Sequence, residues 1–187
     1  MRKLLSLGFL FVLFLSCDEG VVITSPTSRT FEFVLTDNEV NSDPNNEVVR
    51  ERLVDVNQFF TEEGGQIESV KLDELKYTIS GYNNTSGDVV LMDLKMETRI
   101  NNGDPNPILQ LTGLVVENTG EVIAFEDGNP ESVLSAAQVA SLESIMDNLE
   151  PFDIIVTATF SQNIDSGLTV AITWGITASI SQDTTGG

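Results

Sequence analysis

Apolar and polar residues alternate along most of this chain, the pattern of β-strands that bury one face. The longest alternations lie toward the C-terminal end. The apolar positions are Phe152, Ile154, Val156, Ala158 and Phe160 in one run, and Leu168, Val170, Ile172, Trp174, Ile176, Ala178 and Ile180 in the next. Threonines fill the opposite faces. The pattern predicts two strands joined as an antiparallel hairpin, with Trp174 in the core.

Shorter alternations predict further strands at 31–35, 75–79, 90–100, 108–117 and 122–125. Turn residues fill the connectors 81–87 and 118–120, so each is expected to close a hairpin. Val70 and Leu72 are out of phase with Leu75, which indicates a β-bulge near Asp73 and Glu74. The folded domain is expected to begin near Thr30.

Two segments show a helical period instead. The first has its apolar stripe at Val49, Leu53, Val56 and Phe60. Asp43-Pro44 is expected to start this helix and Gly64-Gly65 to end it. In the second, Ser135 and Gln138 fit a capping box and Pro151 follows the end; its stripe is Val139, Leu142, Ile145, Met146 and Leu149. About seven strands with two amphipathic helices predict a mainly β, antiparallel β-sandwich-like single domain.

Composition removes several classes of function. The chain has 187 residues, with 9 Lys and Arg against 29 Asp and Glu, and a formal net charge of −20. Such a surface repels nucleic acid, so no nucleic-acid partner is expected. There is no histidine and one cysteine, which excludes Ser-His-Asp and Cys-His catalysis, imidazole-based metal sites and an internal disulfide.

The N-terminal residues form an export signal. Arg2-Lys3 precede the apolar run Leu4–Leu15, which is shorter than the ~20 residues of a membrane-spanning helix. The ending Phe14-Leu15-Ser16-Cys17 resembles the lipobox of bacterial lipoproteins. The resemblance implies that the signal is cut before Cys17 and that Cys17 is acylated. The alternatives are a secretory signal with an incidental cysteine, or a signal anchor.

The lipoprotein interpretation divides the chain into four parts. Residues 1–16 are the signal peptide, 17–29 the acylated cysteine and a tether, 30–181 the β-sandwich-like domain, and 182–187 a C-terminal tail. The start Cys17-Asp18-Glu19-Gly20 resembles small envelope lipoproteins of Bacteroidetes-type bacteria. That resemblance implies an outer-membrane lipoprotein exposed at the cell surface, whereas an Asp after the cysteine favours inner-membrane retention in enterobacterial lipoproteins.

An acidic stretch after the first strand is a candidate calcium site. Asp37, Glu39, Asn41 and Asp43 offer oxygen ligands at alternate positions, which a curling loop could aim at one cation. Compared with an EF-hand loop, the stretch lacks the turn glycine and the bidentate glutamate, since Ser42 and Val48 stand there. The alternative is a solvated loop whose Asp43 or Asn45 caps the following helix.

Two other features are candidate sites. The acids Glu117, Glu121, Glu126, Asp127 and Glu131 surround one short strand. Paired carboxylates are the one general acid–base pair that this composition allows, and they are the pair of glycoside hydrolysis, but charged turns explain these acids as well. Tyr82 is the one aromatic residue in a turn where it could meet a ligand, although such a tyrosine is usually plain surface.

Three functional hypotheses follow. The first is a non-enzymatic, acyl-anchored envelope domain that binds or scaffolds an envelope protein or glycan, with the membrane as its other partner. The second is a carrier of an apolar ligand held between a helix and the sheet. The third is a carboxylate-based hydrolase. The first is preferred, with no enzymatic activity and no cofactor beyond the candidate calcium.

Overall fold

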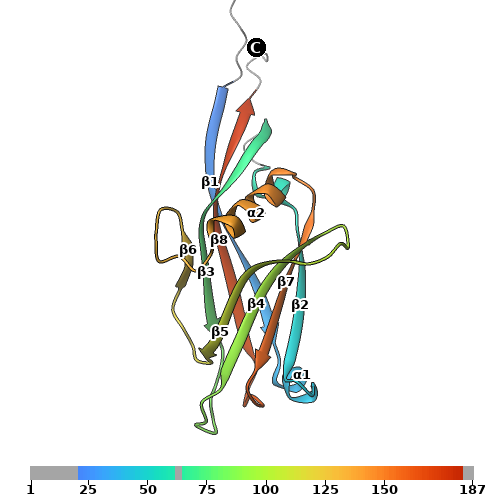
Figure 1. Ribbon diagram of the computed structural model, residues 1–187, viewed down its shortest axis with the longest axis vertical. Coiled ribbons are helices and arrows are strands. Elements are labelled where there is room, and N and C mark those ends of the chain that lie inside the picture. Colours follow the sequence, from blue (N-terminus) through green and yellow to red (C-terminus); the bar gives the residue numbers. More distant parts are fainter. Residues whose placement is uncertain (1–20, 62–64, 183–187) are drawn as a thin grey trace, which may run out of the picture.

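The computed structural model describes residues 21–61 and 65–182. These residues form eight strands, two α-helices and one short 3-10 helix (Figure 1). In chain order the elements are β1 (Val21–Leu35), α1 (Asp37–Ser42), β2 (Glu47–Val54), η1 (Val56–Phe59), β3 (Gln66–Ser80), β4 (Leu91–Ile100), β5 (Asn106–Val115), β6 (Val122–Glu126), α2 (Ala136–Asp147), β7 (Phe152–Phe160) and β8 (Leu168–Gln182).

The strands form two four-stranded antiparallel sheets, and this confirms the predicted β-sandwich. Sheet A has the order β1-β8-β3-β6, and sheet B has the order β2-β7-β4-β5. This interleaving of early and late strands in both sheets is the order of a jelly roll. Because inward side chains of both sheets meet in one layer, β4, β7 and β8 bury alternate residues along most of their length.

Trp174 lies at the centre of this layer, as its position in the alternation predicted. Its side chain is fully buried. The indole stacks on Phe152 at 6.1 Å between ring centroids and meets the edge of Phe31 at 5.2 Å. One aromatic contact therefore comes from each sheet, so Trp174 ties the two layers together.

The helix predicted over residues 49–60 is wrong. Residues 47–54 form β2, which pairs with β7, and only one turn of 3-10 helix follows, with the Asp55 carboxylate accepting the Asn57 N–H. Val49 and Leu53, half of the supposed buried stripe, are 46% and 67% exposed. The residues that β2 buries are Val48 and Val54, which have the period of a strand.

Three predicted hairpins are also wrong. The connectors β3–β4, β5–β6 and β7–β8 each join strands of different sheets, so these pairs face each other across the core. Among the described strands, the one hairpin between sequential strands is β4–β5, through the turn-rich residues 101–105. A jelly roll requires this, because its consecutive strands alternate between the two sheets except at this one central hairpin.

Two local expectations had different outcomes. The bulge near Asp73 and Glu74 is confirmed, because the pairing of β3 with β8 shifts register between Leu72 and Glu74. The tether was extended too far, because β1 begins at Val21 and residues 21–29 pair with β8 without interruption. The short alternation starting at Phe31 was therefore only the second half of a longer strand.

Helix α2 closes one side of the sandwich. The predicted Ser135–Gln138 capping box is present. The carboxylates of Glu143 and Asp147 accept the backbone N–H groups of Leu72 and Val70, at 3.0 and 2.6 Å. These N–H groups belong to the part of β3 that β6 does not reach. The helix thus satisfies an open sheet edge. Neither α-helix of the described residues is long and apolar enough to cross a membrane.

Candidate functional site

The acylation site proposed from the sequence, Cys17, lies outside the described residues. The first described residue, Val21, pairs with the last, Gln182, at the end of the sandwich where β1 begins and β8 ends (Figure 1). The connectors β3–β4 and β7–β8 and helix α1 lie at the opposite end. Strand β1 alone spans about 50 Å between the two ends.

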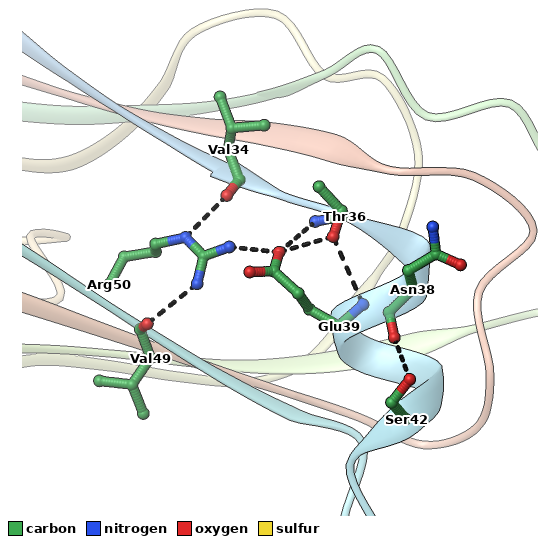
Figure 2. Close-up of polar contacts among 7 residues, drawn as sticks. All are labelled: Val34, Thr36, Asn38, Glu39, Ser42, Val49 and Arg50. Atoms are coloured by element: carbon green, nitrogen blue, oxygen red, sulfur yellow. Dashed lines mark hydrogen bonds and ion pairs between the residues drawn. The ribbon is translucent and has the colours of Figure 1, made fainter.

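The acidic stretch is a helix, and the predicted loop is wrong. Thr36 begins α1 with a capping box in which its hydroxyl accepts the Glu39 N–H (Figure 2). The Glu39 carboxylate accepts a hydrogen bond from the Thr36 hydroxyl at 2.6 Å and forms an ion pair with Arg50. These hydrogen bonds, from Thr36 first and then Arg50, lower the pKa of Glu39.

The remaining calcium candidates point to other partners. The Asn41 amide bonds the backbone of Ile164 in both directions, and the Asp43 carboxylate accepts the N–H groups of Asn45 and Glu47. On a helix, residues two positions apart lie about 160° apart around the axis, so Glu39 faces away from Asp37 and Asn41. Within residues 21–61 and 65–182, no three acidic, histidine or cysteine side chains form a group that could hold a metal ion.

In the second acidic cluster, around β6, two of the acids form ion pairs with lysines of β3 in sheet A. Asp127 pairs with Lys71 at 2.5 Å, and Glu121 pairs with Lys76 at 3.1 Å. The hydrogen bond from Lys71 lowers the pKa of Asp127. Glu117 lies apart from these pairs, beside the hollow next to Tyr82. The cluster therefore stabilises charged turns, and these contacts do not set two carboxylates against each other across a cleft.

Tyr82 is buried rather than displayed, with 6% of its surface exposed. Its backbone bonds the Asn118 side chain in both directions, at 3.1 and 2.9 Å. Nearby, the Asp165 carboxylate accepts the N–H groups of Thr85 and Ser86. Burial, with a smaller effect of the Asp165 charge, raises the pKa of the Tyr82 phenol. Together these bonds join the connectors β3–β4, β5–β6 and β7–β8 at one end of the sandwich.

A hollow of about 430 Å³ lies next to Tyr82, between the start of β4 and the end of β5. Its amide side chains already bind the backbone. Asn84 bonds Asp88 and Gly87, and Asn118 bonds Tyr82. These groups hold the connectors in place and are not available to a ligand.

A second hollow, of about 350 Å³, lies on the outer face of sheet B, which we call the sheet B hollow. It is lined by Glu47, Asp93, Leu94, Lys95, Gln110, Thr157 and Thr159. The sheet faces the viewer in Figure 1, and no helix crosses β2, β7 or β4. Glu47 begins β2, Asp93 lies near the start of β4 and Thr159 near the end of β7, so the hollow lies at the ends of these strands that are close to α1.

Strand pairing sets the polar side chains of this hollow in two rows. Glu47, Thr159 and Asp93 form one row across β2, β7 and β4. Val49, Thr157, Lys95 and Gln110 form the next, across all four strands of sheet B. Successive rows on one face are about 7 Å apart. The hollow therefore presents carboxylates, hydroxyls, an amide and an ammonium on a rigid sheet.

Several of these groups are free to bind a ligand. Within the described part of the chain, the side chains of Gln110 and Thr157 make no hydrogen bond. Lys95 pairs with Glu97 at 2.7 Å on the rim, and Asp93 accepts only the Gly113 N–H. This arrangement can bind a polar ligand through many hydrogen bonds. Sequence reasoning missed it because the row depends on which strands are neighbours, although the outward parity of Asp93 and Lys95 was visible.

Comparison with known proteins supplies no family. No protein-family model matches the sequence, and no curated protein matches it significantly. The decameric BFDV capsid protein has a TM-score of 0.39 at 9% identity, covering 84% of this chain and 99% of that chain. The 60-mer of the same protein scores 0.36 at 10% identity, covering 90% and 98%. Desmodium yellow mottle tymovirus scores 0.33 at 11% identity, covering 84% and 90%. Scores this low carry no argument about function.

Proposed function

We propose that this protein is an acyl-anchored, non-enzymatic binding domain of the bacterial outer membrane, exposed at the cell surface. The observation that carries the proposal is the position of Val21 at one end of the elongated sandwich. Residues 18–20 alone separate it from Cys17, so a lipid on Cys17 would attach that end to the membrane. The opposite end, and the sheet B hollow near it, would then point away from the bilayer.

A binding role agrees with the chemistry of the described residues. The chain has no histidine. Its acidic candidates are engaged in helix capping, ion pairs and turns. Hydrolysis would need a positioned acid and base with different environments. Rigid connectors and a polar face suit recognition better.

A carrier of an apolar ligand is the second candidate. Leu142, Ile145 and Met146 of α2 are buried in the core, so the contact between helix and sheet is filled. A hollow of about 370 Å³ does lie beyond the end of α2, with Leu149 and Ile180 among its lining residues. If a fluorescent fatty acid bound in this hollow and Leu149→Ser abolished that binding, transport of an apolar ligand would become the preferred function in place of the binding domain proposed above.

The anchor is tested by labelling cells with palmitate. We expect label in the wild type and in Asp18→Ala, which keeps the cysteine, and none in Cys17→Ala. Protease treatment of intact cells then tests the exposed location, and degradation is expected without lysis. Equal membrane association without label in all three proteins would refute the anchor. A labelled protein that resists protease until lysis would place it inside the envelope.

A further inference from the structure

We propose that the sheet B hollow is a binding site for a neutral oligosaccharide. This inference rests on the proposed binding function and names its ligand class. The site is the pair of polar rows on β2, β7, β4 and β5, where Asp93, Lys95, Gln110 and Thr157 lie on neighbouring strands.

The mixture of side chains favours a ligand rich in hydroxyl groups. Carboxylates accept hydrogen bonds, an ammonium donates them, and amide and hydroxyl groups do both. A sugar hydroxyl also donates and accepts, so one ring can satisfy neighbouring groups of opposite kinds. An apolar ligand would strip water from Asp93 and Lys95 without replacing the lost hydrogen bonds, which is unfavourable.

The charge of the site and of the whole protein favours a neutral ligand. The hollow has two carboxylates, Glu47 and Asp93, and one lysine, which is already paired with Glu97. The whole chain carries a formal charge of −20. An anionic polysaccharide or nucleic acid would be repelled by both.

Apolar side chains flank the polar rows and can contact the C–H surfaces of a sugar. Val49 lies in the second row, and Leu91 and Val115 pair with each other beside the first row. All three are 40–48% exposed. Four strands span about 14 Å, so the face can accommodate more than one ring. The hollow contains no aromatic side chain, so binding is expected to be weak, in the micromolar to millimolar range.

The test is a titration of the purified, anchored protein with maltohexaose, cellohexaose and chitohexaose in separate experiments. The protein is held in a detergent without a sugar headgroup, because such a headgroup would compete. Backbone amide NMR shifts report the binding site. We expect saturable shifts with at least one hexasaccharide at residues 93–95, 110 and 157–159.

Variants of the free side chains make the test specific. Gln110→Ala with Thr157→Val should weaken binding about tenfold, because it removes hydrogen bonds with little effect on folding. Thr169→Val, on the outer face of sheet A, is the matched control and should bind like the wild type. Both are expected to melt near the wild-type temperature.

Three results would overturn the proposal: no saturable shift with any of the hexasaccharides, shifts confined to the Tyr82 hollow, or equal weakening by the control variant. These outcomes are separate from the palmitate experiment. If the protein is labelled with palmitate and exposed at the cell surface but binds none of the sugars, the proposed function stands and only the oligosaccharide site is refuted.

Discussion

Arg50 joins the edges of the two sheets, and its removal should destabilise the protein measurably. Its Nε donates to the Val34 carbonyl of β1 at 2.9 Å, and its Nη1 donates to the Val49 carbonyl of β2 at 3.2 Å (Figure 2). Its Nη2 pairs with Glu39 of α1. The planar guanidinium reaches all three acceptors at once, which a lysine cannot do.

The cost of Arg50→Met follows from these contacts. A hydrogen bond to a charged group contributes ~1.5–3 kcal/mol when well buried. The Arg50 side chain is 29% exposed, so water can replace part of each bond. We therefore assign about 1 kcal/mol to each carbonyl bond and about 2 kcal/mol in total. The ion pair with the more exposed Glu39 adds little. For a domain of this size, that loss lowers Tm by about 4–8 °C.

Arg52→Met is the matched control, since Arg52 lies on the same strand, is exposed and makes no side-chain hydrogen bond or ion pair with the described residues. It should change the free energy of unfolding by less than about 0.5 kcal/mol. Urea unfolding of both variants, with unchanged m-values, provides the measurement. If Arg50→Met costs no more than Arg52→Met, Arg50 does not hold the sheet edges together.

The effect of Arg50 should also depend on pH through Glu39. The pKa of Glu39 is lowered in the folded protein, so the stabilising contribution of the ionised Glu39 carboxylate is complete above the ordinary glutamate value of 4.5. The contribution is lost as the pH falls through the lower folded value. The difference in stability between wild type and Arg50→Met should therefore narrow below pH 4.5. A difference that grows with acid would contradict this assignment.

Three further predictions test the core, the hydrogen bonds from α2 to β3, and calcium binding. Trp174→Ala should cost ~3–5 kcal/mol, and wild-type emission should be blue-shifted; emission like free tryptophan would show an exposed indole. Glu143→Ala and Asp147→Ala should each cost ~1–3 kcal/mol in urea unfolding, because each leaves a β3 N–H group without its acceptor; wild-type stability in both would show that α2 does not protect this edge. Millimolar calcium should leave Tm unchanged, since Asp37 and Asp43 do not converge; a rise abolished by changing both to Asn would restore the calcium site.

The alternation of side chains predicted the sandwich faces well. In β7 and β8 the inward residues, Trp174 included, were identified from parity alone. Parity is reliable here because both strands lie inside their sheets, flanked by neighbours on each side. Edge strands break the rule. In β2, Val49 and Leu53 face solvent, so apolar residues stand on both faces and imitate a helical stripe.

Strand connectivity could not be predicted from turn residues. Asn118-Thr119-Gly120 and residues 81–87 do reverse the chain, as their composition indicates. A turn of this length can lead to a neighbouring strand in the same sheet or to the opposite sheet, about 10 Å away. The choice depends on long-range packing of both sheets. The jelly-roll order is therefore a property of the whole fold rather than of any one turn.

The same limit explains why the sheet B hollow was not found from the sequence. Asp93, Gln110 and Thr157 belong to three strands that become neighbours only through the sheet order β7-β4-β5. The acidic stretch from Asp37 to Asp43 was noticed instead because its oxygens are close in sequence. Proximity along the chain was misleading there, since a helix directs alternate residues to opposite sides.

The polar and charged side chains of this protein have two distinct roles, and this separates stability from binding. Arg50, Glu143 and Asp147 bond backbone groups at open sheet edges. An acid in the last turn of α2 is unfavourable for the helix dipole, so Asp147 is explained by the Val70 N–H that it accepts. Gln110, on the sheet B face, makes no comparable contact within the described residues. Substitutions of the side chains that bond these open sheet edges should therefore lower stability. Substitutions on the outer face of sheet B should instead alter binding at nearly constant stability.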